Sequence, residues 1–360
     1  MKVSLSNIEI NNEIKKVVLS VLDSKKFILG EHTKKFEENF AKLSGVKYAA
    51  CVNSGTAALF LTLKSLGIKK NDEVILPSLS YVATSTPVSM LNAKPKFVDV
   101  NEKNYTIDVD AIEKNITKKT KGIIPVHLYG HPANMDKIKK IAKENSLFVL
   151  EDAAQAHGAK YNNKPIGSLG NAACFSFYPS KNLTVCGDGG IVVSNNSDLI
   201  KKIKILRDHG RTEKYVHNVL GYNLRFNEIQ AAIGNIMLKK LPSSNASRRK
   251  IAKYYDQELY SKVITPYIEK WATPVYLMYT IRTKKRDELQ KFLKNRGIST
   301  GIHYPIPIHK QPVYKEFNKI KMPITEEIAD TTLSIPMHPN LPNNQQKYVI
   351  KNINEFFENR

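Results

Sequence analysis

The sequence has 360 residues, more than a single core usually accommodates, so we expect a large and a smaller domain. It contains neither an apolar run of about 18 residues nor the apolar segment of a signal peptide, so we expect a cytoplasmic protein. Its three cysteines lie far apart, which argues against a disulfide framework and against a metal site. The formal net charge of +22 comes from short, scattered groups of lysine and arginine, which are typical of a solvated basic surface rather than of a nucleic-acid-binding face.

Between residues 45 and 195, short apolar runs rich in β-forming residues alternate with helical patterns. The runs expected to form strands are "KYAACV", "DEVILP", "KPKFVDV", "TKGIIPVHLY", "LFVLEDA", "CFSFYP" and "GGIVVSN". This alternation predicts an α/β fold with a mostly parallel sheet that is covered by helices on both faces. Ligands of such sheets bind at the carboxyl ends of the strands, so we expect the functional residues there.

The pattern changes after residue 195. A long helical stretch begins near Asn227, and Pro242 within it indicates a kink or a break. The weaker β signal "VYLMYTIRT", the helical run "RDELQKFLKNRG" and the loop "GIHYPIPIHKQPVY" follow. We therefore predict a large domain over residues 1–245 and a smaller α+β domain over residues 246–360.

The segment "NSGTAA" follows the first expected strand and opens a helix. Its Ser54, Gly55 and Thr56 would offer backbone amides and hydroxyls at the positive end of that helix, which suits a phosphate group. An ordinary capped turn between a strand and a helix has the same pattern, so this segment alone leaves both readings open.

The run "LFVLEDAAQAHGA" ends an apolar strand with Glu151 and Asp152. A carboxylate at the end of a buried strand needs a cationic or hydrogen-bonding partner, because an unpaired buried charge is costly. A protonated aromatic nitrogen would be such a partner. A structural salt bridge or a helix cap would satisfy the carboxylate equally well.

Lys181 lies in "FSFYPSKNLTVCGDGG", just past a later strand. A lysine in a partly desolvated turn has a lowered pKa and can attack a carbonyl carbon to form an imine. A phosphate-binding turn, a strand-end aspartate and such a lysine at one sheet edge are a rare combination. Together they favour an enzyme whose lysine forms an imine with the carbonyl group of a substrate or of a cofactor.

Seven motifs extend this interpretation over essentially the whole chain: "NSGTAAL", "PSLSYVATSTPV", "VHLYGHPANMD", "EDAAQAHGA", "SFYPSKNLTVCGDGGIVVSN", "HGRTEKYVHNVLGYNLRFNEIQAAIG" and "GIHYPIPIHKQPVY". In this order they resemble the pyridoxal-phosphate-dependent sugar aminotransferases of the DegT/DnrJ/EryC1/StrS family. The resemblance implies the type I (aspartate aminotransferase-like) fold, with a mixed, mainly parallel seven-stranded sheet and a small C-terminal domain. It also implies a homodimer with both active sites at its interface.

The resemblance assigns roles around the cofactor, pyridoxal 5'-phosphate. Lys181 matches the lysine that holds the cofactor covalently, and Asp152 matches the carboxylate that pairs with its protonated ring nitrogen. The ring can accept electrons only while that nitrogen keeps its proton. Gln155 matches the residue that contacts the ring hydroxyl, and Tyr81 matches the aromatic side chain that stacks on the ring.

The resemblance also implies how the phosphate is bound. Gly55, Thr56 and Ser176 fall where the family binds it. Asn223, in "GYNLR", matches an asparagine that the partner subunit donates to the same phosphate, so a monomer would have an incomplete site. Judged without the family, Asn223 would be a turn residue next to Gly221.

The segments "EKYVHNVLGYNLRFNEIQAA" and "HYPIPIHKQPVY" resemble members that aminate the third carbon of a dTDP-linked 3-keto-6-deoxyhexose, with L-glutamate as the donor. The expected product is a dTDP-3-amino-3,6-dideoxyhexose of the Fuc3N or Qui3N type, made for lipopolysaccharide, capsule or another glycan. His217 and His309 are candidates for contacts with the sugar or its diphosphate. Tyr178 occupies a position where many relatives have histidine, a variation known in the third-carbon group, and is a third candidate.

Several alternatives remain open. The enzyme could instead aminate a 4-keto-6-deoxyhexose linked to UDP, GDP or dTDP, and galacto and gluco products are not distinguished. Arg207, Arg211 and Arg225 are equal candidates for holding the carboxylate of glutamate. Related dehydratases have histidine in place of the lysine, so Lys181 argues against that chemistry. From a different class, a non-catalytic binder of nucleic acid would use the positive charge alone.

Overall fold

The computed structural model describes residues 1–259 and 263–358. Its main sheet has seven strands in the order β1-β9-β8-β5-β4-β2-β3. The bounds are β1 Tyr48–Val52, β2 Glu73–Pro77, β3 Lys94–Val98, β4 Thr120–Ile123, β5 Phe148–Asp152, β8 Ala172–Ser176 and β9 Gly190–Ser194. Strand β9 is antiparallel to both of its neighbours, and the other pairs are parallel. The predicted mixed, mainly parallel sheet is confirmed.

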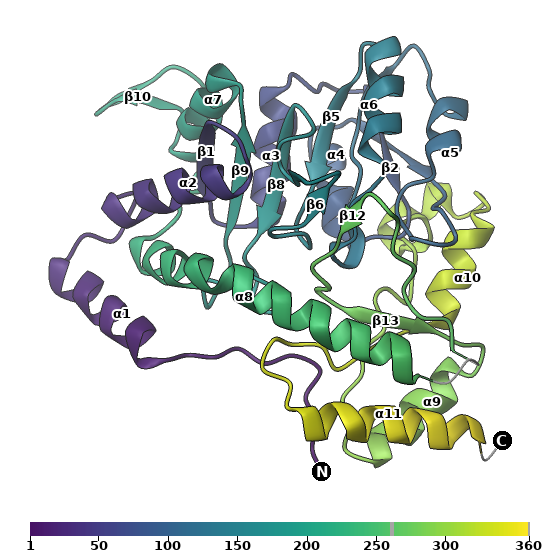
Figure 1. Cartoon of the computed structure of the whole chain (residues 1–360). Helices are drawn as coiled ribbons and strands as arrows, with labels where there is room; N and C mark the ends of the chain where they lie inside the picture. The colour runs from purple at the N-terminus through teal and green to yellow at the C-terminus, as the bar shows by residue number, and fades with distance from the viewer. Residues whose placement is uncertain (260–262, 359–360) are drawn as a thin grey trace.

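Helices cover both faces of this sheet (Figure 1). On one face are α3 Gly55–Ser65, α4 Thr86–Met90 and α7 Ser197–Arg207; on the other are α2 Glu31–Leu43, α5 Val109–Lys114 and α6 Met135–Glu144. Consecutive strand residues point to opposite faces, so Val149 packs in one core and Leu150 in the other. Because both faces are buried, these strands are continuous apolar runs, which is why they could be recognised in the sequence.

Helix α8, Glu228–Glu258, is 31 residues long and runs across the molecule between its two parts (Figure 1). The side chain of Asn227 caps its start by accepting a hydrogen bond from the backbone N–H of Gln230 at 2.8 Å. The helix continues through Pro242, so the break expected there does not occur. Pro242 is exposed, so water can bond the carbonyl that loses its helical partner.

The N-terminal half of α8 packs against α1, Asn12–Ser24, and α2, and its other half contacts α11, Asn343–Glu358. Residue 245, the predicted domain boundary, therefore lies inside a continuous helix. The two-domain division stays a prediction.

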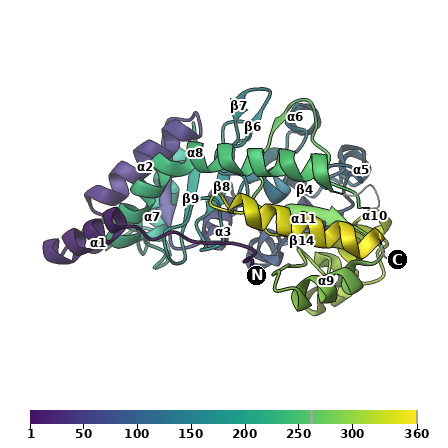
Figure 2. The same cartoon turned by 60° about the horizontal axis from the view of Figure 1, so that its bottom comes forward.

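A second core lies beneath α8 (Figure 2). It contains the antiparallel strands β13, Tyr279–Arg282, and β14, Thr332–Ile335, together with α9, Arg286–Asn295, and α11. Val3 is buried in this core and pairs with Ile298. The first residues of the chain thus lie with the C-terminal part, an arrangement that the range 1–245 did not anticipate.

Short elements complete the fold. Their bounds are η1 Val82–Thr84, η2 Leu128–Gly130, β6 Lys160–Tyr161, β7 Lys164–Pro165, β10 Arg211–Glu213, β11 Val216–His217, β12 Ala272–Thr273, η3 Ile308–Lys310, η4 Pro312–Phe317 and α10 Pro323–Thr331. The β10–β11 hairpin projects from one end of the main sheet (Figure 1). Across residues 1–259 and 263–358, no helix has both the length and the apolar character needed to span a membrane.

Candidate active site

A pocket of about 420 Å³ lies at the carboxyl edge of the main sheet, within the size range of small-molecule sites. Asp152 is the last residue of β5 and Ser176 the last residue of β8, and both line it. Eight predicted site residues line it: Gly55, Thr56, Tyr81, Asp152, Gln155, Ser176, Tyr178 and Lys181. The fold therefore brings together residues that are spread over more than a hundred positions of sequence.

The start of α3 forms one end of the pocket. Ser54 is its N-cap, and its hydroxyl accepts a hydrogen bond from the backbone N–H of Ala57 at 3.1 Å. A Cβ added to Gly55 would lie 2.8 Å from the Cβ of Ser176, so only glycine allows the helix start to approach β8 this closely. The remaining free amides and the hydroxyls of Thr56 and Ser176 form an environment suited to an anionic group.

Asp152 is 5% exposed, and both of its carboxylate oxygens are hydrogen-bonded. Oδ2 accepts a hydrogen bond from the hydroxyl of Thr84 at 2.7 Å, and Oδ1 accepts one from the backbone N–H of Ala154 at 3.2 Å. Burial raises the pKa of Asp152, while these two hydrogen bonds and the charges of Lys181 and His127 lower it. The carboxylate is thus a buried negative charge with capacity for a further cationic partner.

Lys181 lies in the turn between β8 and β9, where its backbone N–H donates to the carbonyl oxygen of Tyr178 at 2.8 Å. Burial lowers the pKa of its ammonium group to about 8, with Asp152 opposing the shift. No hydrogen bond or ion pair joins its Nζ to another of the described residues. The neutral, nucleophilic form of this lysine is therefore far more populated near neutral pH than it is in an ordinary exposed lysine.

Gln155 and Tyr81 also line the pocket, and both contact Tyr304. The side-chain Oε1 of Gln155 accepts from the backbone N–H of Tyr129 at 2.7 Å, and its Nε2 donates to the hydroxyl of Tyr304 at 3.2 Å. The ring of Tyr81 is 57% exposed, and its centroid lies 5.7 Å from that of Tyr304. Tyr81 therefore has a free face available for stacking on a flat ligand.

Two predicted residues lie outside this pocket on the surface. Asn223 is exposed in the segment that follows the β10–β11 hairpin, and its backbone forms an isolated antiparallel β-bridge with Asp208. His217 is the last residue of β11, and its Nδ1–H donates to the carbonyl oxygen of His209 at 2.9 Å. Neither side chain reaches the pocket of its own chain.

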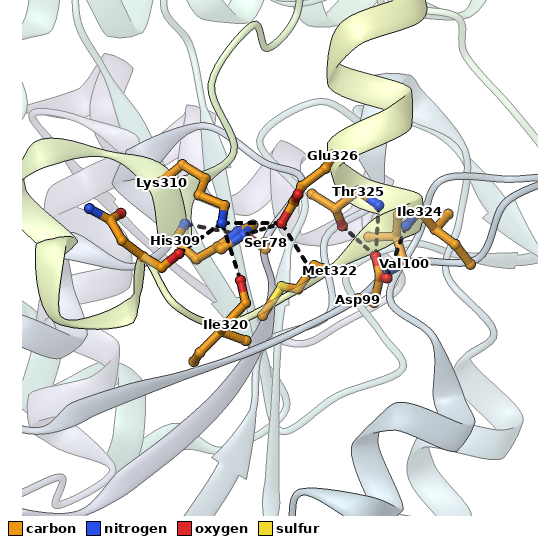
Figure 3. A network of polar contacts seen from close by, with 11 residues as sticks. Ser78, Asp99, Val100, His309, Lys310, Ile320, Met322, Ile324, Thr325 and Glu326 are labelled. Atoms are coloured by element: carbon orange, nitrogen blue, oxygen red, sulfur yellow. Dashed lines mark hydrogen bonds and ion pairs between the residues drawn. The ribbon is translucent and has the colours of Figure 1, made fainter.

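His309 corrects an expectation (Figure 3). Its side chain is 0% exposed, with Nδ1 2.5 Å from the hydroxyl of Ser78 and Nε2 3.1 Å from a carboxylate oxygen of Glu326. The ring thereby joins η3 to the end of β2 and to α10. A fully buried and doubly hydrogen-bonded ring has no surface to offer a ligand, so His309 does not contact the sugar.

The three candidate arginines also lie outside the pocket. Arg207 is buried against Glu37, 2.6 Å from a carboxylate oxygen, and also donates to the carbonyl oxygen of Cys51. Arg211 and Arg225 both pair with Asp208. The structure therefore does not select one of them as the partner of a substrate carboxylate.

Sequence reasoning missed several pocket residues. These are Ser80, Thr84, Met278, His303 and Tyr304, besides less polar or peripheral ones. Four of them lie in the motifs "PSLSYVATSTPV" and "GIHYPIPIHKQPVY", but their residue types alone do not indicate which side chains face a ligand. Met278 precedes β13, so the second part of the molecule also contributes to the pocket.

The family model for the DegT/DnrJ/EryC1/StrS aminotransferase family matches residues 8–354. A "Pleiotropic regulatory protein" of Geobacillus stearothermophilus is 42% identical over 97% of this chain and 95% of its own length. The dTDP-3-amino-3,4,6-trideoxy-alpha-D-glucose transaminase of Streptomyces venezuelae is 40% identical over 97% of this chain and 93% of its own length. GDP-perosamine synthase of Escherichia coli is 38% identical over 92% of each chain.

A solved structure gives the same picture. The chain of Streptomyces venezuelae DesV in complex with a ketimine intermediate superposes with a TM-score of 0.97. The two chains are 40% identical, and the match covers 99% of each. The similarity therefore extends over the whole architecture described here, the pocket included.

The pocket fits pyridoxal phosphate, the cofactor of this family. The start of α3 and Ser176 suit its phosphate, the buried carboxylate of Asp152 suits its protonated ring nitrogen, and the unpaired amine of Lys181 suits its aldehyde. Each of these groups lines the same cavity.

Proposed function

Because this chain belongs to the DegT/DnrJ/EryC1/StrS aminotransferase family, we propose that it transfers the amino group of L-glutamate to a dTDP-linked 3-keto-6-deoxyhexose. The protein is a nucleotide-sugar aminotransferase that depends on pyridoxal phosphate. The identity of the sugar and of the amino donor is proposed, as are the residue roles and the homodimer given below. The product would be a dTDP-3-amino-3,6-dideoxyhexose, made in the cytoplasm for a surface glycan.

One observation carries the assignment of the chemistry: Lys181, in the turn after β8, and Asp152, at the end of the neighbouring strand β5, line one pocket. We assign Lys181 to the covalent attachment of the cofactor and Asp152 to its ring nitrogen. Gly55, Thr56 and Ser176 would bind the phosphate, Gln155 the ring hydroxyl and Tyr81 the face of the ring. The hydroxyls of Thr56 and Ser176 and the amide of Gln155 have the hydrogen-bonding capacity that these roles need.

When bound, the cofactor supplies an electron sink for the charge that develops as the donor loses its α-proton. Lys181 is the base that takes this proton and later returns one, and a pKa of about 8 lets its amine do both near neutral pH. Asp152 keeps a negative charge beside the ring nitrogen. The hydrogen bond between Gln155 and Tyr304 fixes the position of the Gln155 amide, which can then contact the ring hydroxyl of the cofactor.

The proposal includes a homodimer. Leu220 is 90% exposed and Tyr215 is 82% exposed, both close in sequence to Asn223. Large apolar side chains this exposed favour a protein–protein contact. We assign Asn223 of the partner subunit to the cofactor phosphate, which would complete a site that one chain leaves open.

Similarity to the Streptomyces venezuelae transaminase supports amination at the third carbon. Tyr178, 54% exposed at the pocket, and His217 remain candidates for substrate contacts. Similarity to GDP-perosamine synthase supports a second candidate, amination of a 4-keto-6-deoxyhexose linked to UDP, GDP or dTDP.

Turnover assays distinguish these candidates. The purified enzyme is incubated with glutamate and, separately, with each keto sugar, and the aminated carbon is located by NMR. We expect a 3-amino product from the dTDP-linked 3-keto sugar and none from the Lys181→Ala variant. A 4-amino product without turnover of the 3-keto sugar would overturn the choice of substrate.

A further inference from the structure

Two hydroxyl groups lie behind the carboxylate of Asp152. The Thr84 hydroxyl is 2.7 Å from Oδ2 of Asp152, and the Ser80 hydroxyl is 2.7 Å from that of Thr84. All three side chains are buried, and all three residues line the pocket. Both hydroxyls come from the segment after β2, whereas Asp152 ends β5.

The direction of the hydrogen bonds follows from the donors available. An ionised carboxylate only accepts, so the single proton of the Thr84 hydroxyl is donated to Asp152. The contact between Ser80 and Thr84 must then be donated by Ser80. The three groups form a chain of hydrogen bonds in which each donor supports the next acceptor.

Asp152 is held from the other directions as well. Its Oδ1 accepts a hydrogen bond from the N–H of Ala154. Its backbone N–H donates to the carbonyl oxygen of Pro125 at 2.9 Å, and its backbone carbonyl oxygen accepts from the N–H of His127 at 3.1 Å. The Thr84 hydroxyl and the Ala154 N–H thus hold one carboxylate oxygen each, and the contact from Thr84 is the shorter of the two. Removing the Thr84 hydroxyl would leave the rotation of the carboxylate to the longer contact alone and would leave a buried charge with one donor fewer.

We propose that Thr84 is a positioning residue for the reaction: its hydroxyl fixes the orientation of the Asp152 carboxylate and supports its negative charge beside the cofactor's ring nitrogen. This inference rests on the proposed role of Asp152. Thr84 acts through Asp152 and takes no part in bond making itself.

The other groups around Asp152 do not replace Thr84. Lys181 and His127 lower the pKa of Asp152 by their charges, but less than the Thr84 hydrogen bond does. Tyr304 and Cys174 also face Asp152, and the pKa of each is raised, chiefly by burial, which leaves both groups neutral. All four remain in a Thr84 variant, so a change in the titration of Asp152 can be attributed to the lost hydroxyl.

The test compares Thr84→Val, which removes the hydroxyl at nearly constant volume, with Thr84→Ser, which restores it. The matched control is Thr325→Val, because Thr325 is also buried and its hydroxyl also donates to a carboxylate, that of Asp99, at 2.7 Å (Figure 3). Three quantities are measured: the Kd of pyridoxal phosphate, the pH titration of the bound cofactor's visible spectrum, and the free energy of unfolding of the apoprotein.

For Thr84→Val we expect cofactor binding weaker by about tenfold, as for loss of a hydrogen bond to a charged group. The spectral transition should also move to higher pH, because the carboxylate is protonated more easily. Thr84→Ser should restore both values. Thr325→Val should lower stability but leave the Kd and the spectrum as in the wild type.

If Thr84→Val lowers the stability but leaves the spectral titration and the Kd of pyridoxal phosphate unchanged, the inference is overturned. Thr84 would then have only a structural role. If this variant does not fold, Thr84→Ala, which buries no methyl group against the carboxylate, decides by the same criteria. Asp152→Asn separates the two proposals. Wild-type binding and spectra in that variant would overturn the role of Asp152 and the inference with it, whereas an impaired Asp152→Asn beside a normal Thr84→Val would overturn the inference alone.

Discussion

The side-chain carbonyl oxygen of Gln155 accepts a hydrogen bond from the backbone N–H of Tyr129 at 2.7 Å. Because its Nε2 donates to the hydroxyl of Tyr304, both ends of the amide are engaged. The orientation of Gln155 is therefore set before any ligand binds, and its second amide proton remains available to the pocket. Gln155 thus links the η2 turn, which contains Tyr129, to the loop that contains Tyr304.

Replacing Gln155 with leucine should leave the buried N–H of Tyr129 without a partner. We expect the free energy of unfolding of the apoprotein to fall by about 1–3 kcal/mol in urea titrations, and cofactor binding to weaken. Gln155→Glu is the matched control, since it retains the acceptor for Tyr129 and loses the donor. It should preserve more of the stability but not the cofactor affinity, and wild-type affinity in Gln155→Leu would contradict the role given to this residue.

Lys181→Ala should abolish covalent retention of the cofactor. The protein is mixed with pyridoxal phosphate, reduced with borohydride and weighed by mass spectrometry. The wild type should gain the mass of one reduced cofactor at Lys181, and the variant should gain none there. Lys201→Ala, at an exposed lysine on α7, should behave as the wild type. Specific labelling of another lysine in the wild type would refute the assignment.

The pH dependence of cofactor capture should reflect the lowered pKa of Lys181. Burial brings this pKa to about 8, and only the neutral amine attacks the aldehyde. In stopped-flow measurements, the rate should therefore rise with pH up to about 8 and then level off. A rate that keeps rising toward the ordinary lysine pKa of about 10.4 would show that the amine is not desolvated.

His309→Leu should destabilise the protein without changing substrate recognition. Loss of the ring removes its contacts with Ser78 and Glu326, and the buried Ser78 hydroxyl keeps only the contact from the backbone N–H of residue 309. We expect a free energy of unfolding lower by about 1–3 kcal/mol. The KM for the nucleotide sugar should stay close to that of the wild type. A large rise in KM with unchanged stability would restore His309 as a substrate contact.

Leu220→Asp should disrupt the proposed homodimer. A charge at a side chain that is 90% exposed costs a free monomer little, but it is unfavourable in an apolar interface. Light scattering after gel filtration should give a dimer for the wild type and a monomer for the variant. The monomer should bind pyridoxal phosphate more weakly, because Asn223 of the partner subunit is missing. A variant that stays dimeric would place the interface elsewhere.

Much of the fold could be predicted because the central strands are buried on both faces. Six of the seven runs marked in the sequence contain a whole strand of the main sheet, and the seventh, "CFSFYP", overlaps the last three residues of β8. The strand-end residue Asp152 and the loop lysine Lys181 were predicted for the same reason, since the carboxyl ends of parallel strands meet at one edge. Ser176 was predicted only from the family resemblance. The type of each side chain then indicated its chemistry.

Other features depended on contacts distant in sequence. Pro242 does not end α8, because both halves of that helix pack against other elements and the proline itself faces solvent. Val3 joins the core formed by the C-terminal residues, which no local pattern near the N-terminus indicates. The sequence around His309 and around Thr84 does not indicate what either side chain contacts. His309 is buried between β2 and α10, whereas the hydroxyl of Thr84 donates to Asp152.

The sequence by itself determined where the main strands lie along the chain, the family and the cofactor. It also determined the residues whose chemistry is distinctive, above all Lys181 and Asp152. Hydrophobic periodicity and motif spacing depend only on residues close together in the chain, so they can be recognised in the sequence alone. Only the tertiary structure decided which ordinary polar residues serve the pocket and which serve the scaffold. A histidine or threonine acquires its role from burial and from partners that folding brings within about 3 Å, and these are set by packing rather than by position in the chain.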